Sequence, residues 1–138
     1  AVGARGEHTD PGLLPLWTPA APGGVQAFSP DEGWFAVDPR PGTVVVNLAD
    51  CMQVWTNDRY RAAMHRVLPM DTTDRMSIPY FFNPAVDAVV APADELVGSD
   101  PIYRSFVFRE FINARGADNY ADAGVDDTQI SDYRIFTT

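Results

Sequence analysis

The sequence contains no lysine, and all ten of its basic residues are arginine. These arginines form no basic patch, and the net charge of −9 argues against a polyanionic partner such as nucleic acid. The single cysteine, Cys51, cannot form an internal disulfide and lies in an apolar stretch, which favours a small buried side chain. No apolar run approaches the ~20 residues of a membrane helix, and no secretory signal pattern is visible. We therefore expect a soluble, cytoplasmic protein without a membrane partner.

The distribution of proline and glycine along the chain is typical of an all-β domain. Twelve prolines and ten glycines separate short apolar runs within 138 residues, a length suited to one folding unit. Strands are predicted at 12–17, 24–28, 34–37, 43–48, 62–67, 75–82 and 88–90. The valine-rich segment 43–48 is expected to be a buried strand. Their spacing suggests a sandwich or jelly roll.

The pattern changes near residue 100. Residues 103–114 are compatible with a short amphipathic helix that stops at Gly116. An Asp-rich loop is expected up to residue 127, followed by a docked tail at 130–136. The predicted C-terminal part is therefore helical, in contrast to the strands before it.

The two histidines of the chain are candidate metal ligands. His8 and Asp10 are two residues apart, so on a strand their side chains would point to the same face. His65 is the only other imidazole, and it lies on a predicted strand. Two histidines and one carboxylate are the ligand set of non-haem Fe(II) oxygenases. The competing interpretation is that both histidines are ordinary half-buried residues.

A second group of polar residues follows ten positions after His65. Arg75 and Ser77 would point in one direction from a strand, and a guanidinium beside a hydroxyl is suited to binding a carboxylate. A surface ion pair is the alternative role for Arg75. The same alternation places Phe81 on this face, where it would either contact a substrate or pack in the core.

Taken together, four segments resemble the 2-oxoglutarate and Fe(II)-dependent dioxygenases of the isopenicillin N synthase-like superfamily. The resemblance covers about residues 5 to 92. Its motifs are HTDPGLL from His8, PGTVVVNLAD from Pro41, WTNDRYR from Trp55 through HRV at His65, and RMSIPYFF from Arg75. It implies that His8, Asp10 and His65 bind iron, and that Arg75 and Ser77 hold the distal carboxylate of 2-oxoglutarate.

The resemblance also implies a fold and an activity. The fold would be a double-stranded β-helix, a cupin-like jelly roll with a short C-terminal helix, formed by a catalytic domain at 1–98 and a helix and tail at 99–138. The activity would be oxygenation at a C–H bond of a small organic molecule, using Fe(II), 2-oxoglutarate and O2 and giving hydroxylation, desaturation or ring closure. An oxidase that does not use 2-oxoglutarate is one alternative. A catalytically incomplete fragment that acts as an association module is another.

Members of this superfamily are longer than this chain, and the resemblance implies that the additional part lies before residue 1. A sheet that lacks a core strand exposes an edge and an apolar face, so we expect self-association or association with such an N-terminal segment. Of the remaining residues, Trp17 and Trp34 are expected to pack in the structure. Asp50 is expected to lie in a turn, with a contact behind the metal ligands as the alternative, and Arg66 to face away from the metal in a supporting role.

Overall fold

A computed structural model of the chain describes residues 5–18, 23–38, 40–69, 77–97, 100–116 and 128–135. The strands within these ranges are β1 (Arg5–His8), β2 (Leu14–Thr18), β3 (Val25–Ser29), β4 (Gly33–Ala36), β5 (Val45–Val46), β6 (His65–Val67), β7 (Ile78–Phe82), β8 (Val89–Val90) and β9 (Phe106–Val107). The helices are α1 (Asp50–Trp55), α2 (Asp94–Val97), α3 (Phe108–Arg115) and the 3-10 helix η1 (Ile130–Tyr133).

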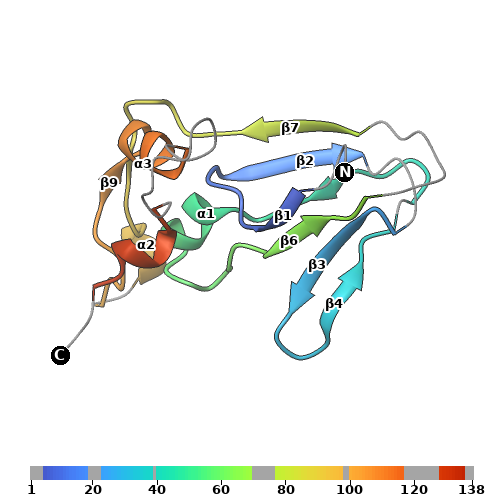
Figure 1. Cartoon of the computed structure of the whole chain (residues 1–138). Coiled ribbons are helices and arrows are strands. Elements are labelled where there is room, and N and C mark those ends of the chain that lie inside the picture. Colours follow the sequence, from blue (N-terminus) through green and yellow to red (C-terminus); the bar gives the residue numbers. More distant parts are fainter. Residues whose placement is uncertain are drawn as a thin grey trace.

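The strands form antiparallel sheets, with the helices gathered at one end of them (Figure 1). One sheet has the strand order β1-β6-β3-β4, and a second has the order β5-β2-β7. A small sheet of β8 and β9 lies beside the helices. Across the described residues these sheets do not close into a barrel. The mainly β architecture agrees with the predicted fold class.

Most predicted strands are present with shifted ends, but the segment 43–48 differs from its prediction. Only Val45 and Val46 are in a strand, and Val46 is 55% exposed, so the expectation of a buried strand was wrong. The strand is short because its start is held in a turn, where Thr43 donates through its amide and its hydroxyl to the carbonyl oxygen of Arg40. Its end leads into helix α1, which the sequence analysis did not predict.

The predicted helix 103–114 is also shorter than expected. Phe106 and Val107 pair with β8, and the helix begins only at Phe108. Tertiary pairing thus overrides local helix propensity at these two residues. The helix ends at Arg115, before Gly116, as predicted. The tail docks through η1, while the predicted loop up to residue 127 is largely outside the described residues.

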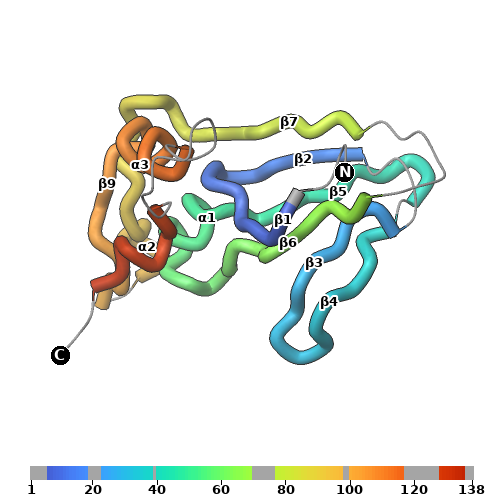
Figure 2. Tube along the Cα trace, in the orientation of Figure 1, coloured from blue at the N-terminus to red at the C-terminus, as the bar shows by residue number. Residues whose placement is uncertain are grey.

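The hydrophobic core lies at the helical end of the molecule (Figure 2). It joins residues from distant parts of the sequence: Leu13, Cys51, Val54, Val90, Tyr103, Phe106, Phe108 and Phe111. The rings of Phe106 and Phe111 lie 4.9 Å apart, and Tyr133 of η1 packs edge-on against Phe111. Cys51 is fully buried, as predicted, and burial raises its thiol pKa to about 12.

A polar network fastens the C-terminal segment to the turn after α1. The Tyr103 hydroxyl donates to Asp58 at 2.6 Å and accepts from Gln53 at 2.6 Å. Arg134 also donates to Asp58, and its guanidinium lies over the Tyr103 ring. Although burial opposes it, these hydrogen bonds hold the pKa of Asp58 below its usual value. The network therefore stabilises the charged form of Asp58.

The sheet β5-β2-β7 has two different faces. Strand pairing aligns Leu16 with both Val46 and Tyr80. We call the side chains of Val46, Ile78, Tyr80 and Phe82 the open face, because each is at least half exposed. Pro79 lies on the edge strand β7, where the missing amide hydrogen is tolerated. No helix in the described ranges has the length and apolar character needed to cross a membrane.

Candidate metal centre

The candidate ligands come together where β1 and β6 pair. His8 is the last residue of β1 and His65 the first of β6, and the two are partners in register. Asp10 lies just beyond β1 in an irregular segment, whereas the prediction placed it on a strand. One potential ligand atom from each of the three side chains lies within 4.8 Å of the others.

The donor atoms are oriented towards a common point. His8 Nε2 is 3.6 Å from one Asp10 oxygen, and His65 Nε2 is 3.5 Å from the other. The opposite ring nitrogens face backbone carbonyls: His8 Nδ1 is 2.8 Å from the oxygen of Gly6, and His65 Nδ1 is 3.1 Å from that of Ala63. A carbonyl partner requires hydrogen on Nδ1, which makes Nε2 the ligating nitrogen. The arrangement fits a divalent cation held by two imidazoles and a carboxylate.

Asp10 is held in place by other groups. Its side chain is buried, and Asn47 donates to Oδ2 at 2.9 Å. The backbone amide of Asp50 donates to the Asp10 carbonyl oxygen at 2.8 Å. Anchoring of this kind fixes a ligand before the metal binds. Asn47 was not among the predicted site residues, because it lies 37 residues from Asp10 in the sequence and no local pattern marks it.

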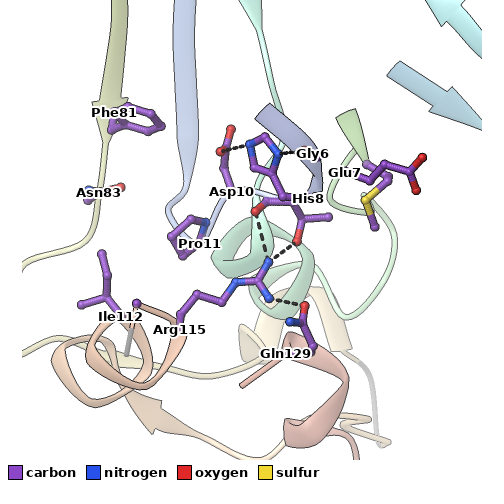
Figure 3. A pocket seen from close by; sticks show the side chains of 13 residues that line it. Gly6, Glu7, His8, Asp10, Pro11, Phe81, Asn83, Ile112, Arg115 and Gln129 are labelled. Carbon is purple, nitrogen blue, oxygen red and sulfur yellow. Dashed lines mark hydrogen bonds and ion pairs between the residues drawn. The ribbon is translucent and has the colours of Figure 1, made fainter. Parts of the chain in front are cut away.

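Two cavities adjoin the three side chains. The larger, about 770 Å³, is bordered by residues 6–11, which we call the metal-site segment, by α3 and by Gln129 (Figure 3). The smaller, about 250 Å³, lies against the side of the sheet β5-β2-β7 that is opposite the open face, and it is bordered by Trp17, Ser77 and Pro79. His8 and Asp10 line both cavities. A cation at this point would be accessible from two sides.

The other predicted site residues have different outcomes. Ser77 lines the smaller cavity, and Phe81 lines both. Phe81 is 44% exposed, which argues against the alternative of core packing. Arg75 lies outside the described residues.

Three further expectations can be compared with the structure. Asp50 is the first residue of α1 and fully buried, so the turn interpretation was wrong. Its backbone contact with Asp10 favours the alternative, a position behind the ligands. Trp17 does pack, but its ring stacks on His65 at 5.9 Å, at the site itself. Arg66 contacts Glu7, Gln26 and the Trp34 ring. These partners agree with a supporting role.

Residues 3–84 match the 2OG-Fe(II) oxygenase superfamily. The chain belongs to this family. The matched region contains strands β1 to β7 and all three candidate ligands. 1-Aminocyclopropane-1-carboxylate oxidase 3 of Arabidopsis thaliana is 41% identical over 106 residues, which are 76% of this chain and 33% of that protein.

Solved structures of family members have the same fold. The rice dioxygenase for auxin oxidation superposes with a TM-score of 0.79 and 28% identity over 96% of this chain and 45% of the other. JOX2, solved in complex with 2OG, Fe and JA, gives a TM-score of 0.71 and 31% identity over 77% of this chain and 32% of the other. These likenesses confirm the predicted jelly roll. The chain spans about a third of the length of the curated relatives that it matches, from 28% to 35%.

Proposed function

We propose that this chain supplies the iron centre of a 2-oxoglutarate-dependent oxygenase that acts on a C–H bond of a small organic molecule. His8, Asp10 and His65 would be the protein ligands. The observation that carries the proposal is the convergence of these three side chains, with both Nδ1 atoms directed to backbone carbonyls. Three ligands on one side of the metal leave positions for the co-substrate and O2.

We assign the co-substrate to the smaller cavity. Ser77 lies on its wall, and Arg75 precedes Ser77 by two residues, so the pair would hold the distal carboxylate of 2-oxoglutarate. When bound, iron and 2-oxoglutarate supply the oxidising chemistry by activating O2, with release of succinate and CO2. The protein contributes ligand geometry, orientation of the co-substrate and exclusion of water.

The larger cavity is the proposed substrate site. Phe81 borders both cavities, and we propose that its ring contacts the substrate. A volume of about 770 Å³ suits a small organic molecule. The JOX2 structure contains 2OG, Fe and JA together, which supports binding of co-substrate and a small molecule within this fold.

Substitution of a ligand tests the metal assignment. His65→Ala should abolish stoichiometric Fe(II) binding in an anaerobic titration, because two ligands hold the ion far less well than three. Phe35→Ala, an exposed aromatic substitution on β4, is the matched control and should bind iron normally. Unchanged iron affinity in His65→Ala would show that the ligand assignment is wrong.

An oxidase that does not use 2-oxoglutarate is the second candidate. A relative named as an oxidase also matches this chain, so the oxidase reaction is tested beside the leading proposal. Measurement of succinate formed per O2 consumed separates them. Stoichiometric succinate supports the leading proposal, and O2 consumption without succinate supports the oxidase.

We further propose that the open face associates with another copy or with a complementary N-terminal segment. Its four exposed apolar side chains support this. The division of the chain at residue 98 falls outside the described residues and stays a prediction, as does the cytoplasmic location.

A further inference from the structure

Arg115, the last residue of α3, reaches from the C-terminal part of the chain to the metal-site segment (Figure 3). Its Nη2 atom donates to the Thr9 carbonyl oxygen at 3.1 Å and to the Thr9 hydroxyl oxygen at 2.9 Å. Thr9 lies between the candidate ligands His8 and Asp10. A contact across 106 residues of sequence thus fixes the backbone between two ligands.

The same guanidinium faces a buried carboxylate. Asp50 is fully buried, and its Oδ2 lies 3.7 Å from Arg115 Nη2. Neither Asp50 oxygen makes a well-formed hydrogen bond to the described residues. The buried negative charge of Asp50 is therefore compensated by the positive charge of Arg115 and by the Thr9 hydroxyl. The Asp50 amide donates to the Asp10 carbonyl oxygen. The backbone of Thr9 and Asp10 is therefore held twice, by Arg115 at Thr9 and by the Asp50 amide at Asp10.

Arg115 also lines the larger cavity, where it could be taken for a substrate anchor. Its hydrogen bonds argue against that role. Nη1 donates to the Thr128 carbonyl oxygen and to Gln129 Oε1, while Nη2 donates to the Thr9 carbonyl and hydroxyl oxygens. Both terminal nitrogens of the guanidinium are therefore hydrogen-bonded to the protein itself.

We propose that Arg115 is a positioning residue for the metal centre, which holds the Thr9–Asp10 segment in the geometry that lets Asp10 meet the two imidazoles. This inference rests on the proposed function. It gives the C-terminal helix α3 a role in iron binding, although α3 itself contributes none of the three ligands.

Iron affinity is the measurement that tests the proposal. Loss of an outer partner of a metal site costs about 10–100-fold in metal affinity, so Arg115→Met should raise the Fe(II) dissociation constant by that factor in an anaerobic titration. Arg115→Lys keeps the charge but loses the two-pronged contact, and should give an intermediate loss. Arg104→Met is the matched control, because Arg104 contacts Asp132 and the Tyr133 ring in the C-terminal segment and should leave iron affinity unchanged.

A double variant separates positioning from stability. Arg115→Met leaves Asp50 buried without its counter-charge, and adding Asp50→Asn removes that charge, so the melting temperature should return towards that of the wild type. Iron affinity should stay low, because the contact with Thr9 is still missing. Iron affinity that recovers together with the melting temperature would overturn the proposal.

Two other results are informative. If Arg115→Met does not fold, wild-type iron affinity in the folded Arg115→Lys variant overturns the positioning role. A wild-type chain that binds no Fe(II) contradicts the proposed function and the inference together. Wild-type binding with equally tight binding by Arg115→Met contradicts the inference alone.

Discussion

The helical end of the molecule and the sheet β5-β2-β7 are built in opposite ways. The helical end buries Phe106, Phe108 and Phe111 almost completely, whereas the open face leaves Ile78 67% and Tyr80 61% exposed. Both regions are apolar and rich in aromatic residues. Apolar side chains stabilise a fold only where another surface covers them, so composition alone does not separate the two regions.

The candidate metal centre lies between these regions and depends on both. The sheet supplies Trp17, Ser77 and Phe81 to the cavities, and the helical end supplies Asp50 and Arg115 behind the ligands. The packed end would hold the ligand geometry and border the substrate cavity, while the sheet would receive the co-substrate in the smaller cavity. The comparison predicts that substitutions at the two ends differ in kind as well as in size.

The largest expected effect is loss of a core aromatic residue. Phe111→Ala should lower the free energy of unfolding by about 3–5 kcal/mol, because Phe111 is fully buried and packs against two other rings. The matched substitution Phe82→Ala on the half-exposed β7 should cost about 1 kcal/mol or less. Urea unfolding measures both. Equal losses in the two variants would show that the open face is as well packed as the core.

The second effect concerns the polar network at the helical end. Asp58→Asn should lower the free energy of unfolding by about 1–2 kcal/mol at pH 7, because the hydrogen bonds from Tyr103 and Arg134 lose their charged acceptor. Asp58 is partly solvated, which keeps the loss below that of a fully buried pair. Urea unfolding at pH 7 measures it.

The wild type and the Asp58→Asn variant can also be compared as a function of pH. The pKa of Asp58 is lowered in the folded state, so its contribution is fully present above the ordinary carboxyl pKa of about 3.9 and is lost as pH falls towards the lower folded value. The stability difference between wild type and Asp58→Asn should therefore shrink below pH 4. Asp132→Asn in the tail is a control without this tie to the α1 turn. A difference that grows on acidification would contradict the assignment.

The sequence was sufficient for the parts of the site that depend on local spacing. His8 and Asp10 are two residues apart in the chain, and His65 lies on a strand as predicted. The strand β1 and its register with β6, which pairs His8 with His65, were not predicted. The strand β7 and the stop of α3 before Gly116 follow from alternation and from glycine. These predictions rely on interactions within a few residues.

Features that depend on tertiary contact could not be predicted in the same way. Arg115 ends a predicted helix, and nothing near it indicates that its partners are Thr9 and Asp50. The helix α1 forms where Cys51 and Val54 turn towards the core, in a segment that has no long periodic pattern. Phe106 and Val107 become a strand only because β8 is beside them. Each case needs a partner from elsewhere in the fold.

The smallest expected effect on stability lies on the open face. The double variant Ile78→Thr and Tyr80→Thr should change the free energy of unfolding by no more than about 0.5 kcal/mol, since both side chains are largely exposed and threonine suits a strand. Its effect on association should be large. Sedimentation velocity should show concentration-dependent self-association of the wild-type chain and a shift towards monomer in the variant, because the apolar face is what a second copy would cover. A wild-type chain that stays monomeric at all concentrations would contradict self-association and leave only the complementary N-terminal segment as the proposed partner of this face. The helical end and the open face would then differ in how well their side chains are packed, but not in their tendency to associate with a second copy.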